Sequence, residues 1–201
     1  LHATIGAERA LGIVCYSGGE IETPGTVHMT RPNGRFVFGA AMPDTDARAR
    51  EMVEGFGAEG VRLDYDSDVR REMWKKFTTV ASNQAVSTLT GGTIGQNQND
   101  PEVRDINIAL MREVLNLAAA FGYDDDLGFD LDRHRATDWM KSPHKPSMLQ
   151  DIEAGRVMEI DSQYAALQSL SRQMGLATPV LDTILPLLKM RARLAGCYPA
   201  G

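Results

Sequence analysis

The stretch that decides the fold is VRREMWKKFTTVASNQAVST, residues 69–88, which is followed by the pair Gly91-Gly92. It contains neither proline nor glycine, so nothing in it interrupts a helix until the two glycines supply a stop. The sequence therefore predicts one long helix over residues 69–88 and a change to helical character near Asp68.

Three further helices are predicted downstream of this stretch. Asp100-Pro101 combines an N-cap residue with proline at the first helical position, and Gly122 ends the helix that follows. A third helix ends at Gly175, and Thr178-Pro179 opens a fourth. Apolar residues recur every three or four positions in all three helices: Val103, Ile106, Leu110, Val114, Leu117 and Phe121; Ile160, Tyr164, Leu167, Leu170 and Met174; Leu181, Ile184, Leu185 and Leu188.

The first part of the chain has the pattern of strands and one helix. Residues 11–16 and 61–65 are predicted strands, and Pro24-Gly25 predicts a turn between two extended segments. Asn33-Gly34 predicts a tight hairpin before a strand at residues 36–39.

A helix capped by Asp44 is expected over residues 45–54. These elements do not make a complete set of βα units. The expected fold class is therefore mainly α, with an all-helical domain over residues 68–201 preceded at residues 1–67 by an incomplete α/β segment.

The composition limits the class of protein. Of 201 residues, 43% are hydrophobic and 24% charged, which is usual for a globular chain with a buried core, and the formal net charge is -6. A net negative charge argues against nucleic acids and anionic membranes as partners, because both require a basic patch. No apolar run is long enough to span a membrane, and no signal peptide is recognised. Cys15 and Cys197 lie far apart without a His cluster, which predicts free thiols, no metal site and a cytoplasmic location.

One glycine motif resembles a dinucleotide-binding loop. Residues 55–60 fit the pattern GxGxxG. That motif binds a pyrophosphate when it connects a strand to a helix N-terminus, whereas here a predicted helix precedes the glycines and a strand follows. We therefore expect these glycines to end a helix and expect no phosphate-binding loop in this chain.

The long helix carries a candidate catalytic lysine. At about 100° per residue, Val80, Asn83 and Ser87 lie within roughly 40° of Lys76 around the helix axis, and Gln84 about 80° away. A lysine beside short polar side chains can bind a carboxylate or protonate a developing alkoxide. The alternative is that Lys75 and Lys76 are two solvated lysines near the start of the helix.

A second polar segment runs from Ser147 through Asp151 to Glu159-Ile160-Asp161. By itself it allows two interpretations. Ser147 is a good N-cap for a short helix, and its carboxylates suit a protein surface. The same residues can also form part of a binding site.

Together, the two segments resemble the C-terminal domain of ketopantoate reductases (2-dehydropantoate 2-reductases). The resemblance rests on Trp74 and Lys76 at the start of the long helix and on Ser147-Met148, Asp151 and Glu159-Ile160-Asp161 further on. Pro24-Gly25, Ile94-Gly95 and the spacing from Gly175 to Pro179 follow the same order as in the family, so the likeness spans nearly the whole chain.

The resemblance implies an NADPH-dependent oxidoreductase that reduces 2-dehydropantoate or a related 2-oxo acid, as in pantothenate biosynthesis. It implies an N-terminal Rossmann domain, a helical C-terminal domain like that of 6-phosphogluconate dehydrogenase, and a homodimer. By the same resemblance Lys76 is the general acid and Ser147, with Asn83 and Gln84, contacts substrate. Glu159 and the backbone near Ile21 are expected beside the cofactor.

Four positions depart from the family pattern. Val80, Gln84 and Ile94 stand where the family has substrate-binding asparagines, so the identity of the 2-oxo acid is not fixed, and Met158 replaces a threonine. The family's glycine-rich start would precede Leu1, so we expect a truncated chain that is inactive alone. The alternative function is a catalytically incomplete helical dimerisation or binding domain without a cofactor site.

Overall fold

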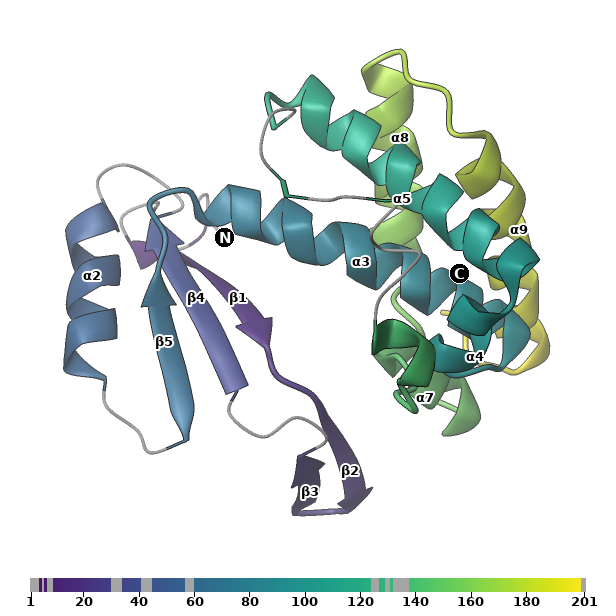
Figure 1. Ribbon diagram of the computed structural model, residues 1–201, viewed down its shortest axis with the longest axis horizontal. Coiled ribbons are helices and arrows are strands. Elements are labelled where there is room, and N and C mark those ends of the chain that lie inside the picture. Colours follow the sequence, from purple (N-terminus) through teal and green to yellow (C-terminus); the bar gives the residue numbers. More distant parts are fainter. Residues whose placement is uncertain are drawn as a thin grey trace. The chain divides into compact units, whose positions relative to one another are not determined.

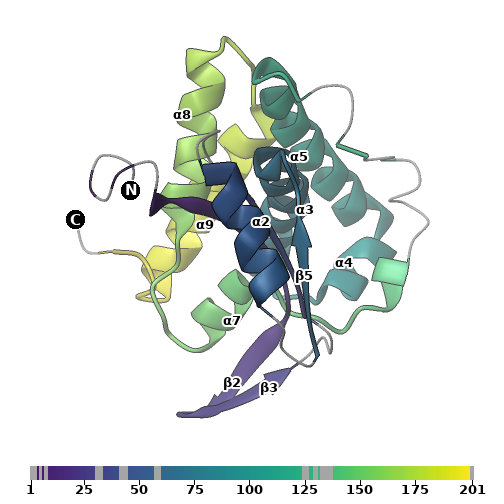
Figure 2. The same cartoon turned by 90° about the vertical axis from the view of Figure 1, so that its left-hand side faces the viewer.

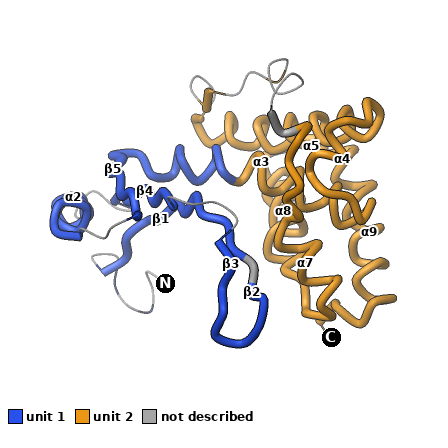
Figure 3. The backbone as a smooth tube through the Cα atoms, turned by 60° about the horizontal axis from the view of Figure 1, so that its bottom comes forward, with its two compact units in different colours: residues 1–76 blue, residues 77–201 orange. Residues whose placement is uncertain are grey.

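A computed structural model of the chain divides into two compact units, residues 1–76 and 77–201, whose boundary lies inside helix α3 (Val69–Thr90) (Figure 3). The structure describes residues 4, 6, 9–29, 34–40, 45–56, 60–123, 127–128, 131 and 138–199.

Unit 1 contains a three-stranded sheet in the order β1-β4-β5. Strand β1 (Leu11–Tyr16) is antiparallel to β4 (Gly34–Ala40), and β4 is parallel to β5 (Val61–Tyr65). Two parallel strands cannot be joined by a tight turn, and helix α2 (Asp46–Gly55) makes the crossover between β4 and β5. It packs along these two strands (Figures 1 and 2).

Glycines let the first turn of α3 approach the sheet closely. Val69 packs with Val14 and Val37 in the core of the unit. A Cβ on Gly39 would lie 2.3 Å from the backbone oxygen of Asp66 and 2.5 Å from the Cβ of Val69. Glycine at this position is therefore a requirement of helix–sheet packing.

Strands β2 (Gly19–Thr23) and β3 (Thr26–Met29) form a separate hairpin, whose turn at Pro24-Gly25 has Gly25 at φ 88°. This confirms the predicted turn. The hairpin predicted at Asn33-Gly34 is wrong, because β4 pairs with β1 and β5 and not with β3. Residues 30–33 themselves, and the predicted cap Asp44, lie outside the described residues.

Unit 2 is built from helices. Besides the second part of α3, its described elements are α4 (Ile94–Asn99), α5 (Pro101–Ala120), the 3-10 helix η3 (Asp138–Lys141), α7 (Ser147–Glu153), the π-helical turn η4 (Asp161–Ala165), α8 (Ala166–Gln173) and α9 (Pro179–Leu194). Helix α5 packs against α4, α8 and α9. The mainly helical fold class after an incomplete α/β segment is confirmed.

Helix ends in unit 2 are satisfied by specific side chains. Asp100 accepts hydrogen bonds from the N–H groups of Glu102 and Val103, as predicted for its N-cap position. The carboxylate of Glu113 on α5 accepts from the N–H groups of Val180 (2.7 Å) and Leu181 (2.9 Å). A buried carboxylate thereby fixes the N-terminus of α9 to α5. None of the described helices is both long and apolar enough to cross a membrane.

Candidate functional site

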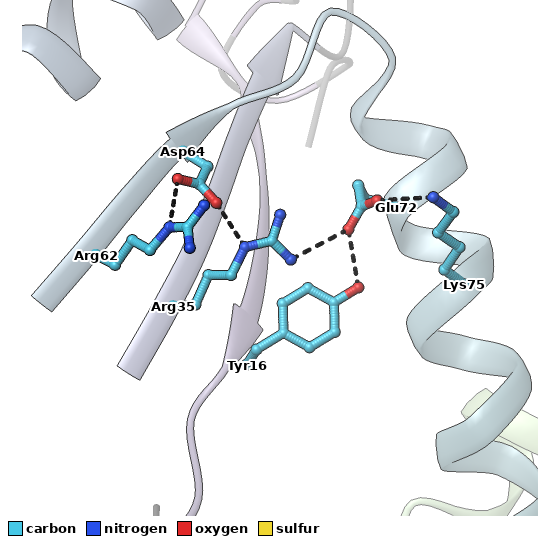
Figure 4. Close-up of polar contacts among 6 residues, drawn as sticks. All are labelled: Tyr16, Arg35, Arg62, Asp64, Glu72 and Lys75. Atoms are coloured by element: carbon cyan, nitrogen blue, oxygen red, sulfur yellow. Dashed lines mark hydrogen bonds and ion pairs between the residues drawn. The ribbon is translucent and has the colours of Figure 1, made fainter. Parts of the chain in front are cut away.

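The two neighbouring lysines of α3 have different surroundings. Lys75 Nζ lies 3.2 Å from Glu72 Oε1, and Glu72 is only 7% exposed (Figure 4). Glu72 Oε2 accepts a hydrogen bond from the hydroxyl of Tyr16 at 3.0 Å and lies 3.9 Å from Arg35 Nη1. Lys75 is therefore part of a structural ion pair, whereas Lys76 is half-buried on the next position of the helix.

Charged groups of β4 and β5 extend this cluster. Asp64 lies 2.5 Å from Arg35 Nε and 2.9 Å from Arg62 Nε, and these hydrogen bonds hold the pKa of its carboxyl below the usual range. Burial, followed by the bond to Glu72, raises the pKa of the Tyr16 hydroxyl. The cluster fixes the turn of α3 that precedes Lys76 to the sheet.

Ser147 is joined to α3 by a side-chain hydrogen bond. Gln84 Nε2 donates to Ser147 Oγ at 2.8 Å. Of the two interpretations of Ser147, the N-cap does not hold: Pro146 is the N-cap of α7, no side chain caps this helix, and Ser147 is its first residue. Ser147 is exposed while Gln84 is buried, so the pair joins the interior of unit 2 to its surface.

Asn83 and Ser87 lie one turn apart on α3, and each side chain accepts a hydrogen bond from a buried asparagine. Asn83 Oδ1 accepts from Asn107 Nδ2 at 3.1 Å, and one turn later Ser87 Oγ accepts from Asn97 Nδ2 at 2.9 Å. Neither Asn97 nor Asn107 was predicted from the sequence to belong to the site. Asn107 is the single polar residue in the apolar stretch 106–110, and this was a visible signal.

Two acceptor atoms of this region have no partner among the described residues, Gln84 Oε1 and Asn107 Oδ1. A buried amide oxygen without a hydrogen bond costs about 1–3 kcal/mol, so such atoms favour a bound water or a polar ligand. Gln84 and Ser147 therefore offer a donor–acceptor pair with remaining capacity for a polar substrate.

The other departures from the family pattern have structural roles. Ile94 is 4% exposed, and its N–H donates to the carbonyl of His144 at 3.0 Å. Met158, at the family's threonine position, is 2% exposed. Val80 is half-buried on α3. All three positions hold apolar side chains that pack, so the amide groups of the site come from Asn83 and Gln84.

The two residues expected near a cofactor are both exposed. Glu159 precedes the π-helical turn, and its carboxylate accepts a hydrogen bond at 3.3 Å from Gln163 Nε2, four residues further along the chain. Ile21 lies in β2 of unit 1 with 77% of its surface exposed. The exposed carboxylate of Glu159 is accessible to hydrogen-bond donors outside the helical unit.

The motif at residues 55–60 follows helix α2 and precedes strand β5, the reverse of the order that a phosphate-binding loop needs. Gly60 has φ 78°, as expected at an exit turn, and residues 57–59 lie outside the described part. Within the ranges that the structure describes, no group of three or more His, Cys, Asp or Glu side chains could hold a metal ion.

Known proteins resemble this chain over nearly its whole length. It is 32% identical over 194 residues to a 2-dehydropantoate 2-reductase of Mesorhizobium japonicum, a match that covers 96% of this chain and 59% of that protein. It is 26% identical over 190 residues to an oxidoreductase of Bacillus subtilis, YkpB, covering 94% of this chain and 63% of the relative. The chain thus spans about three-fifths of the length of these relatives.

Solved structures share the fold. The crystal structure of 2-dehydropantoate 2-reductase from Geobacter metallireducens matches with a TM-score of 0.79 at 26% identity, covering 94% of this chain and 63% of that one. A ternary structure of D-mandelate dehydrogenase with NADH and anilino(oxo)acetate matches with a TM-score of 0.83 at 18% identity, covering 94% and 62%.

The region that carries Lys76, the Gln84–Ser147 pair and Glu159 also matches a family model. Residues 68–192 match the model described as ketopantoate reductase PanE/ApbA C terminal. The match takes in more than half of the chain and every helix of the candidate site. The chain therefore belongs to the ketopantoate reductase family.

Proposed function

We propose that the intact protein reduces a 2-oxo acid, 2-dehydropantoate or a related compound, to the 2-hydroxy acid with NADPH as reductant. The observation that supports this most is the family match over residues 68–192, which includes Lys76, Ser147 and Glu159. That match begins at residue 68, which supports our division of the chain into an incomplete nucleotide-binding domain at 1–67 and a catalytic domain at 68–201.

Lys76 is the proposed general acid. When hydride adds to the carbonyl carbon, negative charge develops on the carbonyl oxygen, and the ammonium group stabilises that charge and then transfers a proton to the oxygen. The first turns of α3 are held to the sheet through Glu72, which fixes the backbone that carries Lys76 (Figure 4). Lys75 cannot perform this role while it is bound to Glu72.

Ser147, Gln84 and Asn83 are the proposed substrate contacts. Ser147 Oγ accepts from Gln84 Nε2 and so keeps its own proton to donate to a carboxylate oxygen of the substrate. Gln84 replaces an asparagine of the family pattern and is one methylene longer, so we expect it to leave less space for the acyl side chain. We therefore propose a small branched 2-oxo acid as the substrate class.

The proposed cofactor contacts are Glu159 and the backbone at Ile21. Bound NADPH would supply the hydride. The Glu159 carboxylate would accept hydrogen bonds from ribose hydroxyls and so orient the cofactor. We propose a homodimer as the assembly of the intact protein.

Two substitutions in the full-length protein test these roles. Ser147→Ala is expected to raise KM for the 2-oxo acid about 5- to 30-fold, because it removes a hydrogen bond to a charged group, with little change in KM for NADPH. Glu159→Gln is expected to do the reverse, since the amide accepts ribose hydrogen bonds more weakly than a carboxylate. Steady-state kinetics with each substrate varied in turn measure both effects.

The melting temperatures of the same variants provide the control. Removing the Ser147 hydroxyl leaves the buried Gln84 amide without a partner, so a small loss of stability accompanies the kinetic change. A lowered melting temperature with both Michaelis constants unchanged would reduce Ser147 and Glu159 to structural residues and would contradict the proposed roles.

A further inference from the structure

The chain reverses direction after helix α9. Ala195 is the C-cap, and Gly196 follows with φ 69°, a left-handed conformation that glycine adopts without strain. The N–H of Cys197 donates to the carbonyl of Ala192 at 2.8 Å and closes the turn. Residues 196–198, which we call the C-terminal strap, then lead back to the segment before η4.

The C-terminal strap contacts the chain on both sides of Glu159. The carbonyl oxygen of Cys197 accepts a hydrogen bond from the N–H of Met158 at 2.9 Å, and Cys197 is fully buried. The hydroxyl of Tyr198 donates to Asp161 Oδ2 at 2.5 Å. One contact thus fixes the residue before Glu159, and the other fixes the first residue of the π-helical turn after it.

Basic residues of α9 complete the attachment. Lys189 Nζ lies 2.6 Å from Asp161 Oδ1, so both oxygens of this carboxylate are bound. The guanidinium of Arg193 lies 4.9 Å from the centre of the Tyr198 ring, a cation–π distance. The bond from Lys189, followed by that from Tyr198, holds the pKa of the Asp161 carboxyl below its usual range, which agrees with this geometry.

We propose that the C-terminal strap positions Glu159 for the nicotinamide cofactor, with Tyr198 and Asp161 as positioning residues. This inference rests on the proposed function of Glu159. A carboxylate on an exposed segment binds well only if its backbone is already ordered, because ordering it on binding reduces affinity. The family match ends at residue 192, so the strap lies beyond the part of the chain that the family model describes.

A matched pair of glycines separates positioning from stability. Gly175 after α8 has φ 70°, and the N–H groups of Gly175 and Leu176 donate to carbonyls at 3.1 and 2.8 Å. Gly196 and Cys197 after α9 make the same two bonds at the same distances. No atom lies within 4 Å of a Cβ placed on either glycine. Gly196→Ala and Gly175→Ala should therefore lower the melting temperature of the full-length protein equally, through the same backbone strain.

The test compares NADPH affinity, by fluorescence titration, and amide hydrogen exchange at residues 157–161 in Gly196→Ala, Gly175→Ala and Tyr198→Phe. We expect Tyr198→Phe, which removes the hydrogen bond to the charged Asp161, to weaken NADPH binding about tenfold. Gly196→Ala, which strains the turn that carries the strap, should weaken it to a similar extent, and both variants should speed exchange at Met158. Gly175→Ala should change neither. Unchanged affinity in the two strap variants, or an equal loss of affinity in Gly175→Ala, would overturn the proposal.

The two readouts also separate this inference from the proposed function. If the wild-type full-length protein binds no NADPH, the proposed function fails, and hydrogen exchange alone decides the role of the strap. Faster exchange at residues 157–161 in Tyr198→Phe but not in Gly175→Ala would then still show that the strap orders Glu159. Equal exchange in all variants would overturn it.

Discussion

Lys76→Ala in the full-length protein is expected to lower kcat by about 10²- to 10⁴-fold, the usual loss when a general acid is removed. Lys75→Ala should leave kcat within a few-fold of wild type, because Lys75 is bound to Glu72 at 3.2 Å. Its loss should instead lower the melting temperature, since the buried Glu72 carboxylate loses one of its partners. Steady-state kinetics and thermal unfolding of both variants measure the difference.

Lys76→Arg refines this comparison. Arginine keeps the positive charge but does not release a proton at neutral pH. It should therefore recover substrate binding, seen as a near-normal KM, without recovering kcat. Equal loss of kcat in Lys75→Ala and Lys76→Ala would show that the catalytic lysine has been assigned to the wrong position.

Gly95→Ala is expected to destabilise the protein by about 1–3 kcal/mol, the range for overpacking a close-packed site. A Cβ on Gly95 would lie 2.6 Å from the carbonyl oxygen of Ser142 and 2.8 Å from that of Met140, and backbone atoms cannot rotate away. Urea unfolding measures the loss. Because residues 140–146 lead into Ser147, KM for the 2-oxo acid should rise as well.

Gly55→Ala is the control for this substitution. Gly55 is the last residue of α2, and nothing lies within 4 Å of a Cβ placed there. Alanine at an unhindered glycine is expected to be neutral or to stabilise by up to about 1 kcal/mol. The close packing of α4 on residues 140–144 would be contradicted if Gly95→Ala were as stable as Gly55→Ala.

Local patterns in the sequence predicted most of the helices. Helix α3 follows from an uninterrupted run before Gly91, and the start of α5 follows from Asp100-Pro101, because caps and breakers act within one helical turn. The π-helical turn at Asp161–Ala165 was not predicted, since one wider turn hardly alters apolar spacing.

The site was less predictable because its contacts join residues far apart in the sequence. Gln84 and Ser147 are 63 residues apart, and Tyr16 and Glu72 are 56 apart. A local rule allowed Ser147 to be a cap as well as a binding residue, and it could not show that the Ser147 hydroxyl accepts a hydrogen bond from another helix. The predicted hairpin at Asn33-Gly34 was wrong for the same reason, because β4 pairs with β1 and not with β3, its neighbour in the sequence.

We propose that the intact protein is a reductase and not a helical binding domain without a cofactor site. The most direct test is to incubate the full-length protein with NADPH and 2-dehydropantoate, and with a panel of related branched 2-oxo acids. We predict that one NADPH is oxidised for each 2-hydroxy acid formed, and that Lys76→Ala slows this oxidation about 10²- to 10⁴-fold. A folded full-length protein that oxidises no NADPH with any of these acids would contradict the account.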